Sequence, residues 1–158
     1  MTMQRVRVAF VLGALAICAG VGSAAEESAT GTVTYIPTYT ETETLANGDT
    51  SQMMHLKGVV LTDDASTSLH LAMQDCIGTT VIPADGGPPD SAGYCAGTNA
   101  DGDLWWIWWH NGPDGNNWGF LGGTGKFKGV EGGGTTDQLA MGADGRQAIS
   151  WKGSWTLK

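Results

Sequence analysis

Residues 101–136 read DGDLWWIWWHNGPDGNNWGFLGGTGKFKGVEGGGTT and contain five of the seven Trp of the chain. The stretch joins an Asp-Gly turn, a Trp-rich apolar run, an Asn/Asp/Gly turn and a Gly-rich segment. Short apolar runs between such turns are typical of antiparallel strands, and the apolar residues lack helical spacing. The stretch therefore predicts a series of β-hairpins.

The rest of the chain follows the same rhythm. We expect strands at residues 30–40, 51–62, 66–75, 91–99, 104–110, 118–121, 132–141 and 147–157. Residues 77–93 contain Gly-Gly-Pro-Pro and should form a long exposed loop. About eight strands with short connections close most economically as an all-β, eight-stranded antiparallel up-and-down barrel, because closure removes the edge strands. A two-sheet sandwich is the alternative.

The N-terminal residues 1–25 have the form of a secretory signal peptide. Two Arg precede an apolar run at 8–21, and small residues at 23–25 suit cleavage before Glu26. The run is too short for a membrane span, and the Ile before Cys18 disfavours a lipoprotein signal. An uncleaved N-terminal helix is a further alternative. We expect a periplasmic or secreted protein with one β-barrel domain at residues 26–158 and no membrane span in the mature chain.

The predicted mature chain is strongly acidic. Cleavage leaves six Lys and Arg against 16 Asp and Glu, a net charge of −10. Phosphate contacts need clustered Lys and Arg, so this charge argues against nucleic acid as a partner. It also argues against anionic lipid surfaces, and it keeps an exported protein soluble.

Two Cys remain in the predicted mature chain, Cys76 and Cys95. An even pair in an exported protein is most simply a disulfide. A metal pair is the minor alternative, because no His or further Cys lies at zinc-like spacing around them. We therefore expect a disulfide and no metal site at these two residues.

The Trp-rich run has two apolar faces. Strand alternation places Leu104, Trp106, Trp108 and His110 on one face and Trp105, Ile107 and Trp109 on the other. One face must line the interior, and the other needs a cover: a subunit, the loop at 77–93 or a ligand. Alternation alone does not decide which face is inside.

This run supplies the candidate ligand-binding residues, which are Trp105, Trp106, Trp108, Trp109 and His110. An aromatic wall suits a flat or short apolar ligand, and an uncovered aromatic face predicts a homo-oligomer or a flat binding surface. Exposed Trp also stacks on sugar rings, which favours a carbohydrate-binding module as a competing interpretation. Ordinary core packing of these Trp is the plain alternative.

The chain has three His, and with Glu131 they are the candidate catalytic residues. His55 and His70 lie on consecutive predicted strands, where a hairpin turn near residues 63–65 would make them cross-strand neighbours. With His110 or a carboxylate such as Glu131, they would form a proton-transfer or metal site. The alternative is that these side chains lie apart, on the surface or along a cavity.

Several motifs are excluded or weak. Asn99, Asp101 and Asp103 look like part of a calcium loop, but the distal Glu is missing and a hairpin turn is favoured. The Gly-rich segment has neither the Rossmann context nor a Gly-Lys-Ser/Thr ending. No Gly-x-Ser-x-Gly is present, and no free Cys remains once the disulfide forms, so acyl transfer lacks support. We expect no cofactor.

The octapeptide GGTGKFKG at residues 122–129, followed by further Gly, resembles the signature of the allene oxide cyclase-like barrels, and dirigent proteins carry a similar one. Small exported bacterial proteins look alike over a longer span, from the Asp-Gly-Asp turn to a final strand like residues 150–157. The resemblance covers the last third of the chain. It implies a calycin-type eight-stranded antiparallel barrel that is often oligomeric.

The plant members of this superfamily bind an apolar substrate or reactive intermediate and steer ring closure or radical coupling largely by shape. None of their catalytic motifs matches this chain residue by residue, so the resemblance implies the fold and not the site. Within the octapeptide, Gly122, Gly123 and Gly125 permit positive φ and close backbone approach at a sharp turn. Phe127 is expected to anchor that turn in the core.

The sequence thus predicts an exported barrel that binds a small apolar or aromatic molecule in its cavity. One alternative is an isomerase, cyclase or lyase that acts by confining a reactive conformer of its substrate. Another is a non-catalytic module that binds carbohydrate or protein.

Overall fold

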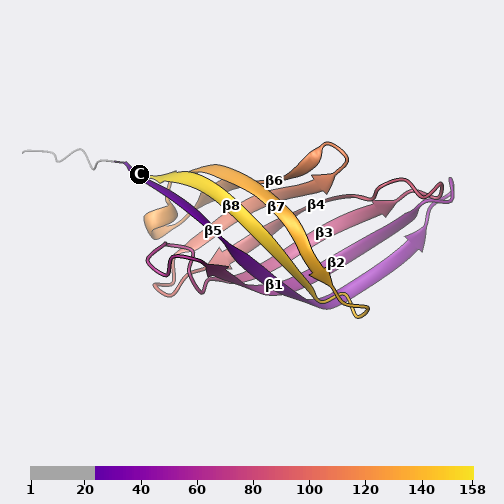
Figure 1. Ribbon diagram of the computed structural model, residues 1–158, viewed down its shortest axis with the longest axis horizontal. Coiled ribbons are helices and arrows are strands. Elements are labelled where there is room, and N and C mark those ends of the chain that lie inside the picture. The colour runs from indigo at the N-terminus through magenta and orange to yellow at the C-terminus, as the bar shows by residue number, and fades with distance from the viewer. Residues whose placement is uncertain (1–23) are drawn as a thin grey trace, which may run out of the picture.

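The structure is a computed structural model that describes residues 24–158. The predicted signal peptide lies almost entirely outside this range. Eight antiparallel strands follow one another around a closed barrel (Figure 1), which confirms the predicted up-and-down architecture. The strands are β1 Ala25–Thr44, β2 Thr50–Thr62, β3 Met73–Ile82, β4 Asp90–Thr98, β5 Leu104–Gly112, β6 Gly115–Gly123, β7 Glu131–Met141 and β8 Gln147–Leu157, with one 3-10 turn, η1, at Gly125–Phe127.

The prediction was wrong between residues 63 and 93. The third strand begins at Met73, not at residue 66, and the loop after it covers only residues 83–89. The alternating apolar residues before Met73 have another cause. Leu69 and Ala72 belong to the β2–β3 loop and are buried against the core. Leu71 and Met73, which alternate with Leu69 in the sequence, are more than half exposed.

The two ends of the barrel differ. One end is closed by the β2–β3 loop and by residues 124–130, which bury Leu69, Phe127 and Val130. The C-terminus and η1 lie at this end, on the left of Figure 1, and the β1–β2 hairpin reaches out at the opposite end. The connections at that opposite end are residues 45–49, 83–89, 113–114 and 142–146.

The Gly-rich octapeptide forms the sharp turn that leads into the closed end. Gly122 and Gly125 have φ of +145° and +51°, values that favour glycine. A Cβ on Gly125 would lie 1.7 Å from Oδ1 of Asp103, so the missing side chain lets the Asp103 carboxylate dock there. That carboxylate accepts a hydrogen bond from the backbone N–H of Lys126 at 3.2 Å. Phe127 then enters the core and is fully buried.

The Asn99 turn is a hairpin turn, as favoured over the calcium loop. Oδ1 of Asn99 accepts hydrogen bonds from the backbone N–H groups of Asp101 and Asp103, at 3.1 and 2.9 Å. Its side chain is therefore used within the turn. The Asp101 carboxylate pairs with the Lys126 ammonium at 2.7 Å, which ties the β4–β5 turn to η1.

Large aromatic rings fill the barrel toward the closed end. Phe120 lies at the centre of the group, with ring centroids 5.4 to 6.2 Å from those of Trp105, Trp118, Phe127 and Trp155. Most of these pairs meet edge to face, an arrangement that aromatic quadrupoles favour. Among residues 24–158, the buried indole nitrogens of Trp105, Trp118, Trp151 and Trp155 have no hydrogen-bond partner. Ring packing therefore positions these aromatic side chains, which form the floor of the barrel interior.

Trp105 also packs flat against the wall of the barrel. Its cross-strand neighbour is Gly97 on β4, and a Cβ on Gly97 would lie 2.0 Å from Cζ2 of the indole. Only a residue without a side chain leaves room for the ring at this position.

The wall is not uniform around the barrel. β6 and β7 pair over only three residue pairs, from Asn117–Thr135 to Gly119–Gly133. The neighbouring β7–β8 ladder has ten. Toward the open end, the Thr136 hydroxyl donates a hydrogen bond to Oδ1 of Asn111 at 2.9 Å and thereby links β7 to β5. The β6–β7 seam is thus the shortest ladder in the barrel.

We expect Gly97→Ala to lower the free energy of unfolding by about 2 kcal/mol, because the added methyl group overpacks the Trp105 ring. Urea denaturation followed by Trp fluorescence measures the change. The matched control is Ala96→Val, on the exposed outer face of the same strand, which should change stability by at most about 0.5 kcal/mol. Equal stability of the two variants would contradict the packing of Trp105 on Gly97.

The predicted disulfide is confirmed: Cys76 and Cys95 are bonded and lie directly opposite each other on β3 and β4. Both are buried on the inner face. Replacing both with Ala should lower the free energy of unfolding by about 3 kcal/mol, since the unfolded chain regains the entropy of the closed loop. Adding a reductant to the wild-type protein should lower its thermal midpoint in the same direction, and should leave the midpoint of the double variant unchanged.

Candidate functional site

The barrel encloses a cavity of about 840 Å³ that opens between the turns at the end opposite η1. It is lined by residues of all eight strands. Its volume is that of a site for one small molecule, since such sites range from about 300 to 1,000 Å³. The cavity is the interior left free because the aromatic floor fills only one end of the barrel.

The deep part of the cavity is apolar and aromatic. Trp105, Ile107 and Trp109 line it from β5, and Trp118 and Trp151 from the strands beyond. Trp109 lies flat across the wall, because its two successive neighbours around the barrel are the glycines at positions 93 and 78. Flat rings against a smooth wall leave a space that suits a planar apolar molecule.

Nearer the mouth, a row of uncharged polar side chains follows the wall. Cross-strand pairing links Gln52 to Thr80, Thr80 to Ser91, Ser91 to Asn111 and Asn111 to Asn116, and Thr136 continues the row on β7. Each of the six strands from β2 to β7 thus contributes one amide or hydroxyl to this row. The hydroxyls of Thr80 and Ser91 lie 2.9 Å apart. We call this row the polar belt.

The cavity wall is nearly free of charge. Asp144, in the β7–β8 turn at the rim, is the one ionisable acid or base, tyrosine apart, among the described residues that line it. Its carboxylate accepts a hydrogen bond from the backbone N–H of Arg146 and pairs with the guanidinium of the same residue, and these contacts lower the pKa of Asp144. Among the described residues, the other Asp and Glu side chains therefore lie outside the cavity.

Gln74 stands out on the deep part of the wall. It lies on β3 with its side chain on the inner face and is only 4% exposed. Its neighbours on both sides are glycines, Gly58 on β2 and Gly97 on β4. Within residues 24–158, the structure shows no hydrogen bond from its side-chain amide to another protein group.

Tyr35 reaches toward Gln74 from β1. Its ring lies over Gly58, where a Cβ would meet Cδ1 of the ring at 2.5 Å. The phenol oxygen lies 3.6 Å from Sγ of Cys76, which is two residues from Gln74 on the same inner face. Because a disulfide sulfur carries no hydrogen, the phenol is the donor in this long contact to a weak acceptor. Burial raises the pKa of Tyr35 well above its usual value, so the phenol stays neutral.

The predicted aromatic residues divide between the two sides of the wall. Trp105 and Trp109 line the cavity, whereas Trp106 and Trp108 lie on the outer face with 39% and 38% exposure. His110 is also on the outer face, where Nε2 lies 2.7 Å from Oδ1 of Asp90. A role in binding a cavity ligand therefore stays a prediction for Trp105 and Trp109, and the outer three residues face a different surface.

The structure does not bring the candidate catalytic residues together. His55 pairs in register with Ile77 and its ring contacts Tyr39 on the outer face, so the predicted pairing with His70 is wrong. That prediction placed the hairpin turn too early, because the β2–β3 connection extends to residue 72. His70 lies in this loop, with Nδ1 2.8 Å from Oγ1 of Thr62.

Glu131 is exposed at the start of β7 and pairs with Lys158, and this ion pair lowers the pKa of its carboxyl group. None of these four candidates lines the cavity.

Sequence reasoning missed the polar lining of the cavity. Thr80 fell in the segment predicted as a loop, Ser91 fell where that loop overlapped the next predicted strand, and Gln74 fell in the strand whose position was wrong. A signal was present on β3, because Gln74 and Thr80 are an even number of residues from the disulfide cysteine Cys76 and therefore face the same side of the strand. Alternation applies only within one strand, so this signal could not be used while the bounds of β3 were wrong.

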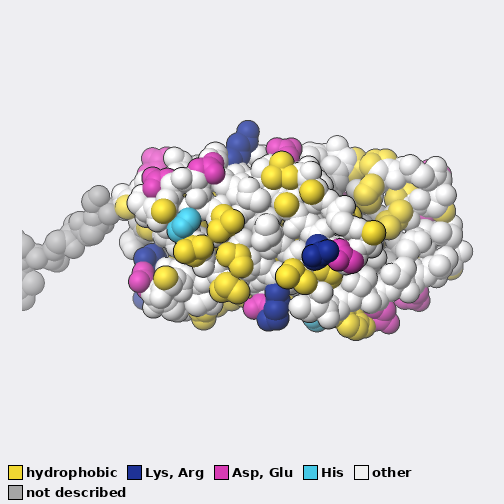
Figure 2. Space-filling view, turned by 60° about the horizontal axis from the view of Figure 1, so that its bottom comes forward, with side chains coloured by type: hydrophobic (Ala, Val, Ile, Leu, Met, Phe, Trp, Pro, Cys, Tyr) yellow, Lys and Arg dark blue, Asp and Glu magenta, His cyan; other side chains and the backbone are white. Residues whose placement is uncertain are grey.

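The outer face of β3, β4 and β5 is rich in exposed apolar side chains. Ile77, Tyr94 and Trp108 form one cross-strand row there, and Ile77 and Tyr94 are more than half exposed. Apolar patches between charged side chains occur elsewhere on the surface as well, on the face drawn in Figure 2.

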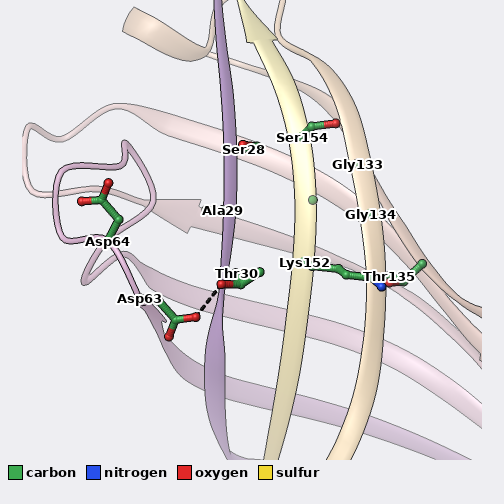
Figure 3. A pocket seen from close by; sticks show the side chains of 11 residues that line it. Ser28, Ala29, Thr30, Asp63, Asp64, Gly133, Gly134, Thr135, Lys152 and Ser154 are labelled. Atoms are coloured by element: carbon green, nitrogen blue, oxygen red, sulfur yellow. Dashed lines mark hydrogen bonds between the residues drawn. The ribbon is translucent and has the colours of Figure 1, made fainter.

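A shallow second depression lies on the outside of the barrel, over β1, β7 and β8 (Figure 3). Small side chains and glycines of these strands make its floor, and Lys152 extends over its cross-strand neighbour Thr135. The Thr30 hydroxyl donates a hydrogen bond to the Asp63 carboxylate at its edge. The depression is open and its polar groups are already paired or exposed, so the cavity is the stronger candidate site.

Within residues 24–158, no helix has the length and apolarity needed to cross a membrane. In the same range, no three His, Cys, Asp or Glu residues converge in a way that would hold a metal ion.

The fold is that of known dirigent proteins. The chain superposes on the pterocarpan synthase dirigent protein GePTS1 with a TM-score of 0.55 and 12% sequence identity, over 85% of this chain and 86% of the other. For the pterocarpan synthase dirigent protein PsPTS1, the TM-score is 0.54 with 11% identity, over 84% and 96%. No protein-family model and no curated protein sequence matches the chain. At this identity the likeness concerns the fold, and the chain is a dirigent-like eight-stranded barrel.

Proposed function

We propose that the barrel binds one small, uncharged, largely apolar or aromatic molecule in its cavity. The observation that carries the proposal is the contrast within a single enclosed space. The cavity of about 840 Å³ has an aromatic floor at its deep end, the polar belt nearer its mouth and one carboxylate at the rim. A charged ligand would lose its hydration without gaining a partner in the deep part, whereas a planar apolar body gains contact with the rings.

The similar solved structures support this proposal at the level of the fold. Both are described as pterocarpan synthase dirigent proteins, so barrels of this shape act on small organic molecules. The substrate of those proteins does not transfer to this chain at 12% identity.

Catalysis by confinement of a reactive conformer is the alternative, in an isomerase, cyclase or lyase. The cavity favours binding over acid–base chemistry by His, because His55, His70 and His110 lie outside it. Any catalytic effect would come from the shape of the space and from neutral hydrogen-bonding groups such as the Tyr35 phenol.

A non-catalytic module for carbohydrate or protein is the second alternative, and it would use the outer aromatic residues. Trp106, Trp108 and Tyr94 are exposed on neighbouring strands. We consider this face better suited to a second copy of the chain, because Ile77, Tyr94 and Trp108 form an exposed apolar row across three neighbouring strands.

We also infer that the protein works outside the reducing cytosol. The Cys76–Cys95 disulfide supports this, since disulfides persist in oxidising compartments. The signal peptide expected at residues 1–25 points to the periplasm or to secretion.

We expect Ser91→Phe to abolish cavity binding, because the new ring projects into the cavity at the level of the polar belt. The matched control is Ala92→Phe, whose ring projects outward from the next residue of the same strand. Binding is measured by the fluorescence of N-phenyl-1-naphthylamine, an uncharged probe. Loss of at least about tenfold in affinity for Ser91→Phe alone corresponds to about 1.4 kcal/mol and supports the cavity. Equal affinity of both variants, or no probe binding by the wild type, would contradict it.

A homo-oligomer through the outer face of β3–β5 makes a separate prediction. Tyr94→Lys should shift the protein toward monomer in size-exclusion chromatography with light scattering, because a buried charge without a partner disfavours association. Thr34→Lys, on the exposed outer face of β1, should leave the mass unchanged. A monomeric wild-type protein would exclude this interface.

A further inference from the structure

We propose that Gln74 and Tyr35 recognise a hydroxyl group on the ligand at the deep end of the cavity. This inference rests on the proposed function and narrows it, since it assigns the ligand to the class of planar apolar molecules that carry a hydroxyl group. It also assigns the orientation: the hydroxyl enters first, and the body of the molecule extends toward the polar belt.

The first step concerns why a glutamine is found there at all. A polar side chain among apolar neighbours needs a hydrogen-bond partner, and the Gln74 amide, unlike the four buried indole nitrogens, borders the cavity space. Gln74 is 4% exposed and faces the cavity, and no protein group among residues 24–158 hydrogen-bonds its amide. Its neighbours in the wall, Gly58 and Gly97, offer no side chain at all. The amide is therefore free to bind a group inside the cavity.

The second step concerns the walls around this amide. The Tyr35 ring lies over Gly58 on one side of Gln74, and the Trp105 ring lies over Gly97 on the other. Both rings replace a side chain that the glycines lack, so Gln74 stands in a slot between two aromatic surfaces. A planar ring that enters this slot contacts apolar faces and meets the amide with its edge.

The third step concerns the phenol of Tyr35. Its oxygen lies on the same wall as Gln74 and is bound only through a 3.6 Å contact to the Cys76 sulfur. A disulfide sulfur is a weak acceptor, so the phenol gains by donating to a better one. The phenol and the amide thus offer a donor and an acceptor on the same part of the wall, and the only hydrogen-bonding contact of either within residues 24–158 is the long one to the Cys76 sulfur.

The fourth step selects the ligand group. A hydroxyl accepts from the phenol of Tyr35 and donates to the amide oxygen of Gln74, so it uses both protein groups in their complementary roles. An ether oxygen accepts only and leaves the amide oxygen buried without a donor. A carboxylate would bring a charge into a space whose deep lining has no cation. The hydroxyl is therefore the group that this wall discriminates best.

The test compares three ligands of one shape: 2-naphthol, 2-methoxynaphthalene and 2-methylnaphthalene. Their dissociation constants are measured on the full barrel by displacement of N-phenyl-1-naphthylamine. We expect the wild type to bind 2-naphthol about tenfold more tightly than the other two, the effect of one net buried hydrogen bond. In Gln74→Met, a side chain of similar length without the amide, 2-naphthol and 2-methoxynaphthalene should bind equally, because the oxygen of each then only accepts from the Tyr35 phenol.

Two further variants make the result specific. Tyr35→Phe keeps the ring over Gly58 and removes one oxygen, and it should reduce the preference for 2-naphthol by about threefold or more. Gln138→Met is the matched control, because this amide is exposed at the mouth and already donates to the carbonyl of Ala140 at 2.9 Å. It should keep the full preference.

The outcomes separate this inference from the proposed function. If the wild type binds the three ligands with equal affinity, the cavity stands and the recognition by Gln74 and Tyr35 is wrong. If it binds none of them, both fail. A purely structural role for Gln74 would lower the thermal midpoint of Gln74→Met while Tyr35→Phe retained the full preference, and that combination would also overturn the inference. Unchanged or higher thermal stability with lost preference is the result we expect.

Discussion

Packing of aromatic rings on glycine is the constraint on which the rest of the barrel depends. Trp105 lies on Gly97 and Tyr35 on Gly58, so each ring takes the place of a neighbour's missing side chain. Rings that lie against the wall fill the closed end without reaching across the barrel. The same geometry leaves the other end free, and it exposes Gln74 between the rings. The same arrangement thus stabilises the barrel and leaves its interior open, since the aromatic rings lie along the wall.

The charges of the chain are arranged in keeping with this interior. Ion pairs such as Lys57–Asp75 and Lys126–Asp101 lie on the outside, where they are exposed and contribute little to stability. The inner face carries amides, hydroxyls and rings instead. A neutral interior inside a strongly acidic protein repels no uncharged molecule and offers an anion no partner. A charged molecule is therefore disfavoured inside the barrel, where it would lose its hydration without gaining a partner.

The sequence predicted the architecture well and the site poorly, for physical reasons that differ. Hairpin turns and strand runs are local signals, and the Cys76–Cys95 pair needed only the compartment to be recognised. The prediction of the β2–β3 connection was wrong because Leu69 and Leu71 alternate with polar residues as in a strand, although both lie in a loop. The inner face of β5 was undecidable because both faces are apolar. The neighbouring strand decides which face lies inside, because Gly97 and Gly93 make room there for Trp105 and Trp109. The sequence of β5 alone does not contain this information.

The short β6–β7 seam gives the barrel a direction in which it opens most readily. Local opening requires the fewest ladder hydrogen bonds to break there, and ladders elsewhere hold the remaining strands together. The rim half of β7 is tied inward by the Thr136–Asn111 bond, which belongs to the polar belt. A molecule that donates a hydrogen bond to Oδ1 of Asn111 would replace the Thr136 hydroxyl and so weaken the link between β7 and β5. A molecule held in the cavity would then leave at a rate that depends on the opening of the β6–β7 side of the wall as well as on the mouth.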